Sequence, residues 1–223
     1  MIQDFKDKHK GETAVIVGNG PSLENAPLYD LGAKYVTFGA NKIYDYPYDT
    51  TYWACADNIM LTECIPWVMK STTFKPEKFV PRDIPLPGAH QMNLKVEIGF
   101  SLDAAKVIYF GGTISFINMQ LAKYMGFDRL LLIGMDHRYT KAQEGGRPGS
   151  KFIATGEDPD HFKTKGGFMP YFQPGRIYNR PELDATEKFF YPLAKRAFAG
   201  GIINLTENSA LTVFQKEAAE KWI

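Results

Sequence analysis

The sequence predicts an α/β fold: a Rossmann-like, mostly parallel sheet with helices on both faces. Short apolar runs of strand length alternate with helical segments along the chain. The runs are almost purely apolar, as expected for parallel strands that are buried on both faces. The first of them leads into a glycine turn, which is typical of a strand-to-helix connection in such a sheet.

Composition narrows the class of protein. With 223 residues, 44% of them hydrophobic and 23% charged, the chain suits one soluble domain, and we expect a single α/β nucleotide-binding domain over residues 1–223. A net charge of +1 argues against a nucleic-acid surface. The polar first ten residues, the absence of a long apolar run and two unpaired-looking cysteines, Cys55 and Cys64, predict a cytoplasmic protein without a membrane span.

The stretch that organises the chain begins with a strand at residues 14–17 and continues through Gly18, Asn19 and Gly20. Pro21 and Ser22 then suit the first turn of a helix. A strand, a glycine turn and a helix start together can bind a phosphate, although an ordinary strand-to-helix turn would look the same. No Lys-Ser/Thr pair follows as in a P-loop, and Leu23 stands where the Rossmann fingerprint needs glycine or alanine.

Two further strands end in polar residues. Residues 35–38 run toward Asn41, and residues 51–56 end at Asp57. At the carboxyl edge of a parallel sheet both side chains could contact a ligand. The alternatives are a turn-forming role for Asn41 and an N-cap for Asp57, before a helix predicted over residues 59–70.

The middle of the chain predicts a strand at 71–74, a proline-rich surface segment over 75–99 and a strand at 106–110. A helix with a clear buried face then opens at Gly112, Thr113 and Ser115 and ends at Gly126. Thr113 is a good N-cap, and a glycine-rich helix start is also a place for a phosphate or ribose.

A strongly apolar strand at residues 129–133 is followed by Asp136, His137, Arg138 and Tyr139. So many polar groups past one strand favour a site over a simple turn. The long, glycine-rich segment 140–180 predicts a lid or insertion; its His161 is either a proton-transfer group or phosphate partner, or an exposed loop residue.

The rest of the chain predicts a helix over 182–199, a strand at 202–205 and a final helix over 206–223. In a parallel sheet the turns after the strands meet at one edge. The polar residues that follow these strands are therefore expected to converge on one site. Tyr44, Tyr46 and Tyr48 either line an acceptor site, form a subunit contact in a homo-oligomer, or simply pack.

Four motifs resemble two related groups of proteins: Val-Gly-Asn-Gly-Pro-Ser-Leu at 17–23, Phe-Gly-Ala-Asn at 38–41, Gly-Thr-Ile-Ser at 112–115 and Leu-Ile-Gly-Met-Asp at 132–136. One group is the bacterial sialyltransferases that use CMP-sialic acid, and the other is the family named after the archaeal 6-hydroxymethylpterin diphosphokinase. The resemblance covers residues 14–214. The segments 134–139, 156–162 and 180–183 look most like bacterial members of the second family.

The resemblance to the sialyltransferases implies that Asn19, Gly20 and Ser22 lie by the nucleotide phosphates, that Asn41 contacts the nucleotide or its sugar, and that Thr113 with Ser115 holds the nucleotide further. Those enzymes carry a histidine base shortly before the penultimate helix. The matching position is near Ile177, where no histidine is present. His161 or His137 could replace it.

These observations leave three hypotheses. The first is a glycosyltransferase that uses a nucleotide-sugar donor of the CMP-sugar type and a small-molecule or glycan acceptor, with no cofactor. The second is a diphosphokinase for a hydroxymethylpterin-like substrate, with Mg²⁺ held by Asp57 and Asp136. The third is a nucleotide- or glycan-binding module without activity. The catalytic candidates are His161, His137 and Asp136; the nucleotide-binding candidates are Gly18, Asn19, Gly20, Pro21, Ser22, Asn41, Asp57, Gly112, Thr113, Ser115 and Tyr139.

Overall fold

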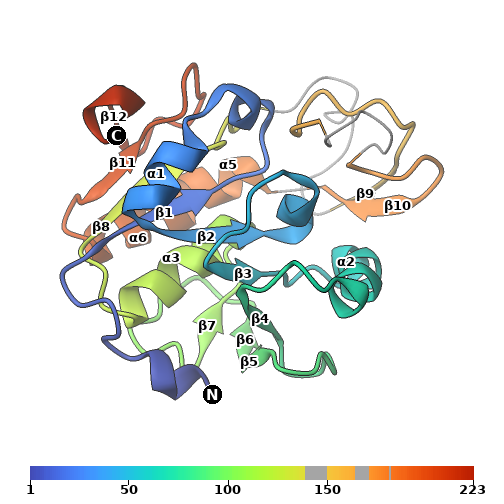
Figure 1. The fold of residues 1–223 in the computed structure, drawn as a ribbon, viewed down its shortest axis with the longest axis horizontal. Helices are drawn as coiled ribbons and strands as arrows, with labels where there is room; N and C mark the ends of the chain where they lie inside the picture. The colour runs from blue at the N-terminus through green and yellow to red at the C-terminus, as the bar shows by residue number, and fades with distance from the viewer. Residues whose placement is uncertain (139–149, 164–170, 181) are drawn as a thin grey trace.

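The centre of the molecule is an eight-stranded, parallel β-sheet, seen in a computed structural model that describes residues 1–138, 150–163, 171–180 and 182–223 (Figure 1). The strand order is β12-β11-β8-β1-β2-β3-β4-β5. The strands are β1 (Thr13–Val17), β2 (Val36–Ala40), β3 (Tyr52–Ala54), β4 (Glu77–Pro81), β5 (His90–Met92), β8 (Arg129–Ile133), β11 (Ile202–Asn204) and β12 (Gln215–Lys216). The parallel sheet that the sequence predicts is confirmed.

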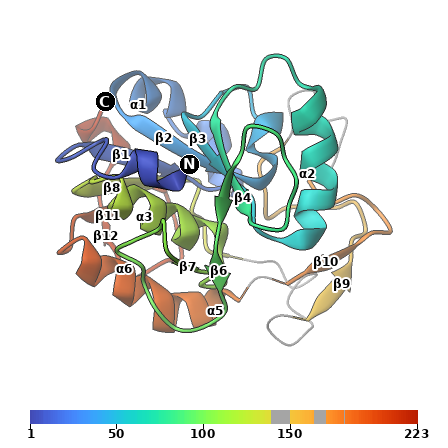
Figure 2. The ribbon, with the colours of Figure 1, turned by 90° about the horizontal axis from the view of Figure 1, so that it is seen from below.

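Helices cover both faces of this sheet, as Figure 2 shows for α1 on one side and for α3 and α6 on the other. Alternate residues of a strand point to opposite faces. Ala14 and Ile16 of β1 accordingly pack in one buried cluster, with α3 (Ile114–Tyr124) and α6 (Tyr191–Ala197). Val15 and Val17 pack in the other, with α1 (Leu28–Lys34) and α2 (Asn58–Lys70).

The order in which the strands are added changes direction at β1. From β1 the chain adds β2, β3, β4 and β5 on one side, and then returns to place β8, β11 and β12 on the other. In register, Thr13 pairs with Arg129 and Val17 with Ile133, so β1 and β8 end at the same level. Open α/β sheets bind ligands in the crevice outside such a switch point.

Smaller elements complete the fold. β6 (Leu94–Lys95) pairs with β7 (Ile108–Tyr109), and β9 (Lys151–Ile153) pairs with β10 (Ile177–Asn179). α5 (Leu183–Ala185) continues through a π-helical turn, η4 (Thr186–Phe190), into α6. Short 3₁₀ helices are η1 (Ile2–Phe5), η2 (Pro21–Asn25), η3 (Asn41–Asp45) and η5 (Ala219–Lys221).

Three sequence-based predictions of secondary structure are wrong. Residues 71–74 do not form a strand; the fourth strand in the chain is Glu77–Pro81, inside the segment predicted to meander over the surface. The proposed final helix over 206–223 is a largely irregular segment, in which β12 pairs with β11. At β4 and at β12, pairing with a neighbouring parallel strand prevails over local propensity.

The described parts of the segment predicted as a lid pack against the domain. In its described parts, β9 pairs with β10, and Phe162, Tyr171, Phe172 and Tyr178 are buried in the cluster that contains α2. A buried ion pair of 2.5 Å joins Lys42 of η3 to Glu63 of α2, and Glu63 also accepts from Tyr178 of β10. These contacts fix β10 against the body of the domain.

Candidate functional site at the carboxyl edge of the sheet

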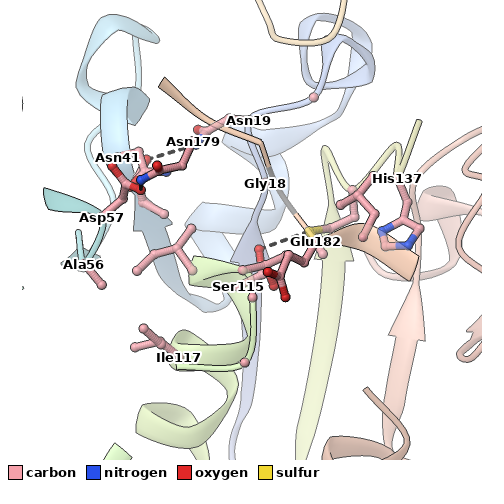
Figure 3. Close-up of a pocket in the computed structure, with 18 of the residues that line it drawn as sticks. Gly18, Asn19, Asn41, Ala56, Asp57, Ser115, Ile117, His137, Asn179 and Glu182 are labelled. Atoms are coloured by element: carbon pink, nitrogen blue, oxygen red, sulfur yellow. Dashed lines mark hydrogen bonds between the residues drawn. The ribbon is translucent and has the colours of Figure 1, made fainter. Parts of the chain in front are cut away.

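A cavity of about 590 Å³ lies at the carboxyl ends of the central strands, in the usual size range for small-molecule sites. The turns after four strands and the start of α3 line it (Figure 3). The sequence-predicted residues that line it are Gly18, Asn19, Gly20, Asn41, Asp57, Gly112, Thr113, Ser115, Asp136, His137 and His161. The expected convergence of these residues is therefore observed, and which ligand they bind stays a prediction.

The glycine turn after β1 is held against the turn after β8. The Gly18 N–H donates to the Ile133 carbonyl at 2.8 Å, and the Gly20 N–H donates to the Gly134 carbonyl at 2.9 Å. A Cβ on Gly18 would lie 2.3 Å from the Gly134 carbonyl oxygen. Gly18 is therefore required by the close approach of two backbones, and Gly20 chiefly by the Asp136 side chain that lies against it. The N–H groups of both glycines are used within the protein.

The negative charge beside this turn belongs to the protein itself. The Ser22 hydroxyl donates to Asp136 Oδ2 at 2.7 Å, and the Ser22 N–H lies 3.4 Å from the same oxygen. Pro21 and Ser22 do not line the cavity. The contact of Pro21 and Ser22 with a nucleotide phosphate therefore stays a prediction, and in this structure the Ser22 hydroxyl is engaged by Asp136.

Asp57 is the N-cap of α2 and also lines the cavity. Its Oδ1 accepts from the N–H groups of Ile59 and Met60 at 2.9 Å each, and its Oδ2 accepts from Asn179 at 2.6 Å. Asp57 follows β3 and Asp136 follows β8, three strand spacings away, or about 14 Å. The strands that carry the two carboxylates are thus not neighbours, and the binding of Mg²⁺ by Asp57 and Asp136 stays a prediction.

No group of three or more His, Cys, Asp or Glu side chains suited to a metal ion occurs among the described residues. Neither does this part of the chain contain a helix with the length and apolar character needed to cross a membrane.

Asn19 and Asn41 present buried amide oxygens to the cavity. Asn19 Nδ2 donates to the Ala40 carbonyl at 3.2 Å and to the Tyr171 hydroxyl at 3.0 Å. Asn41 has a positive φ of 49°, so its turn-forming role is real and it also lines the cavity. Within the described part of the chain, neither side-chain oxygen has a hydrogen-bond partner, which leaves two acceptors for ligand donors.

The N-terminus of α3 opens onto the same cavity. Thr113 occupies the N-cap position but makes no capping bond; its hydroxyl instead lies 3.2 Å from that of Tyr191. Ser115 donates to the Met135 sulfur at 3.3 Å. Gly112 has a φ of 78°, and a Cβ there would lie 2.5 Å from Thr186 Oγ1. This glycine is thus required by the π-helical turn that packs on it.

His161 is held by a carboxylate at the cavity wall. Its Nδ1 lies 2.9 and 3.0 Å from the two oxygens of Asp158, and its ring stacks on Tyr171 with centroids 3.9 Å apart and planes at 8°. His161 is only 9% exposed, so it is not a solvent-exposed loop histidine. A carboxylate on Nδ1 fixes the ring and its tautomer, as in hydrolase triads.

His137 lies on the other side of the cavity from Asn41 and Asp57 (Figure 3). Its Nε2 is 3.2 Å from Glu187 Oε2. Burial lowers the pKa of His137 below its ordinary value, against the opposite effects of Glu187, Asp184 and the Leu183 backbone. Burial would raise the pKa of Glu187, but hydrogen bonds from Thr212 bring it below its ordinary value. The lowered pKa favours the neutral form of His137, whose Nε2 lies near Glu187.

Tyr139 lies outside the described residues. Sequence reasoning missed four residues near the cavity: Asp158, Tyr171, Asn179 and Arg180. Asp158 stands three residues before His161, a spacing that could have suggested the pair. The three tyrosines after β2 pack within the protein: Tyr44 stacks on Trp67, Tyr46 donates to Leu23, and Tyr48 meets Tyr29 edge to face.

Comparison with known proteins supports the fold alone. No protein-family model matches the chain, and no curated protein sequence does, so the resemblance to the pterin diphosphokinase family stays a prediction. Two solved structures share the fold. The MAf glycosyltransferase from Magnetospirillum magneticum AMB-1 aligns with a TM-score of 0.59 and 12% identity over 96% of this chain and 35% of that one.

The sialyltransferase CstII from Campylobacter jejuni, solved in complex with a substrate analogue, cytidine-5'-monophosphate, aligns with a TM-score of 0.54 and 12% identity over 94% of this chain and 86% of that one. Compared with the MAf protein, the chain spans only about a third of that protein's length. Its parallel sheet and the helices on both faces share the α/β fold of these two structures.

Proposed function

We propose that the protein is a glycosyltransferase that uses a nucleotide-sugar donor, of the CMP-sugar type, and transfers the sugar to a hydroxyl of a small molecule or glycan. The observation that supports this most directly is the His161–Asp158 pair at the wall of a switch-point cavity. Both structural neighbours are glycosyltransferases, and the CstII structure contains cytidine-5'-monophosphate, which favours a cytidine nucleotide as the first ligand to test.

The proposed reaction needs a base and a stabilised leaving group. His161 accepts the proton of the acceptor hydroxyl through Nε2, while Asp158 keeps its hydrogen bond to Nδ1 and stabilises the imidazolium that forms. The acceptor oxygen forms a bond to the anomeric carbon, and the bond from that carbon to the donor phosphate breaks. The phosphate leaves with the electron pair, toward the N-terminus of α3 at Thr113.

The nucleotide is tested first. A thermal-shift screen uses CMP, CDP, UDP, GDP and ATP, each with and without Mg²⁺. A ligand at about 100 times its Kd stabilises the native state by about 2.7 kcal/mol, which such a screen detects. We expect a shift with CMP that does not need a metal. A shift with ATP alone that requires Mg²⁺ would favour the diphosphokinase instead.

The base is tested with His161→Gln. His90→Gln is the matched control, because His90 of β5 pairs with Glu77 of β4 and does not line the cavity. We expect His161→Gln to lower the transfer rate about 10²- to 10⁴-fold and to leave nucleotide affinity unchanged. Asp158→Asn should lower the rate less. Wild-type rates in His161→Gln would exclude His161 as the base. Nucleotide binding without transfer from any donor would identify a binding module.

A further inference from the structure

Arg180 directly follows β10 and lines the cavity. Its backbone N–H donates to the Ser150 carbonyl at 2.8 Å, and its guanidinium lies 5.3 Å from the centre of the Phe152 ring. The aromatic face supports the planar cation from one side and leaves its edge available. The strand pair β9–β10 therefore places a fixed positive charge at the cavity wall.

The edge of this guanidinium is unused. In the part of the chain that the structure describes, Nε and Nη1 are both buried and neither has a hydrogen-bond partner. The other two arginines nearby are engaged: Arg176 pairs with Glu63 at 3.1 Å, and Arg138 donates to the Asn208 carbonyl at 2.7 Å. Buried N–H donors of a cation are costly to leave unpaired, so this position is suited to an anion that arrives from outside the chain.

Two carboxylates of the protein that line the same cavity are already occupied. Asp57 accepts from α2 and from Asn179, and Asp136 accepts from Ser22. The Asn179–Asp57 bond at 2.6 Å also fixes the residue before Arg180, and Tyr178 is held by Glu63. The arginine is thus presented on a backbone anchored before the ligand arrives, which reduces the entropic cost of binding.

We infer that Arg180 binds an oxyanion of the donor substrate, either a phosphate oxygen of the nucleotide or the carboxylate of an acidic sugar. Both offer the planar or tripodal oxygens that a guanidinium recognises through paired N–H groups. This inference deepens the proposed function and rests on it. Arg180 would then fix the position of the donor substrate, a role that no sequence motif indicates.

The test measures the affinity of the wild type, Arg180→Gln and Arg180→Lys by calorimetry. The probes are CMP, cytidine, CMP-sialic acid, pyrophosphate, and the nucleotide that gives the largest shift in the thermal screen. Arg196→Gln is the matched control, because Arg196 is an exposed arginine of α6 that lies outside the cavity. Thermal unfolding without ligand shows whether each variant is folded.

We expect Arg180→Gln to lower the affinity for the probe that carries the recognised anion about 10- to 100-fold, as for the loss of hydrogen bonds to a charged group. Arg180→Lys should lower this affinity less. If nucleotide binding falls and nucleoside binding does not, the anion is the phosphate. If only CMP-sialic acid is affected, the anion is the carboxylate. Equal affinities in the wild type and Arg180→Gln for every probe that binds would overturn the inference.

The failure of the proposed function gives a different pattern. Pyrophosphate binding that Arg180→Gln abolishes, with no nucleotide binding to the wild type, would keep the anion site and refute the nucleotide-sugar transferase. The absence of binding by any probe to the folded wild type would overturn both. Arg180→Lys protects the test if Arg180→Gln fails to fold, because it keeps the positive charge beside the Phe152 ring.

Discussion

The two walls of the cavity differ in how their polar groups are satisfied. The first wall, formed by Gly18, Gly20, Ser22 and residues 134–136, is bonded to itself through the two glycine N–H groups and the Ser22–Asp136 hydrogen bond. The second wall, formed by Asn19, Asn41 and Arg180, presents buried polar atoms that have no partner in the described structure. The first wall therefore builds the crevice, and the second wall offers the contacts that a ligand needs.

The comparison shows why a glycine turn after a strand is a weak indicator of phosphate binding. Positions 18 and 20 require glycine because the turn after β8 lies against them. Their N–H groups donate to the end of β8 and to that turn. The same residue pattern would arise with or without a ligand. Unpaired buried groups are the better guide to the ligand-binding wall, and they become visible only in the folded structure.

The largest expected effect comes from breaking the first wall. In Gly18→Ala the new Cβ would meet the Gly134 carbonyl oxygen at 2.3 Å and the Gly134 carbonyl carbon at 2.8 Å, which are backbone atoms that cannot move aside. We expect the free energy of unfolding to fall by about 3 kcal/mol or more. Urea denaturation followed by circular dichroism measures it.

The control is Gly88→Ala, at a φ of 74° with no other atom within 4 Å of the new Cβ. It should cost only about 1 kcal/mol, from the left-handed backbone. If Gly18→Ala proved as stable as this control, the two turns would not be in tight contact and the contrast between the walls would fail.

A substitution in the second wall should lower the affinity for the ligand and leave the free energy of unfolding nearly unchanged. Asn41→Gly keeps the positive φ and removes the buried, unpaired Oδ1. We expect a change of less than about 1 kcal/mol in the free energy of unfolding. Affinity for the nucleotide that binds the wild type should fall about tenfold, as for the loss of one hydrogen bond. Calorimetry and thermal unfolding give the two numbers.

Asn208→Gly is the matched control, since Asn208 also has a positive φ, is exposed and does not line the cavity. It should leave the affinity unchanged. A loss of stability in Asn41→Gly without a loss of affinity would mean that Asn41 has a structural role, like the residues of the first wall.

The smallest effect concerns pH and Asp45, which lies in η3 with Asn41. Burial raises the pKa of Asp45 to about 6 from 3.8, against the attraction of Lys42. Because the folded state holds this proton more tightly, Asp45 makes stability fall as pH rises from about 4 to 6. We expect Asp45→Asn to be more stable than the wild type by about 1 kcal/mol at pH 8, a figure reduced for partial exposure, and equal to it near pH 4.

Urea denaturation at pH 4, 6 and 8 measures this difference. Asp49→Asn, which removes an exposed carboxylate nearby, is the control for the change in net charge. A gain in Asp45→Asn that is the same at all three pH values would mean that the charge of Asp45 is not its cause.

Most of the strands that the sequence predicts correctly have side chains buried on both faces; β7, inside the predicted strand 106–110, is a shorter and less buried exception. β1, β2, β3, β8 and β11 have apolar runs that only a parallel interior explains. β4 escaped detection because Glu77, Lys78 and Pro81 obscure its two buried residues, Phe79 and Val80. β12 has only Gln215 and Lys216, which nothing but the neighbouring β11 marks as a strand.

The site was predictable where residues follow strands, because topology alone brings those positions to one edge. Asn19, Asn41, Asp57 and Asp136 lie there as expected. The partner of each side chain was not predictable, since Ser22 meets Asp136 from 114 positions away and Asn179 meets Asp57 from 122. Arg180 was missed because β10, which places it, is a three-residue strand within a segment that showed no periodicity.

The position of β1 beside β8 has a consequence for the order of events during synthesis. Roughly 110 residues separate the end of β1 from the start of β8, and at about 5–20 residues per second the ribosome needs roughly 5–20 s to add them. During that interval the glycine turn has no partner, because the carbonyls of Ile133 and Gly134 do not yet exist. The crevice between β1 and β8 is therefore assembled late, after the half of the sheet from β1 to β5 has left the ribosome.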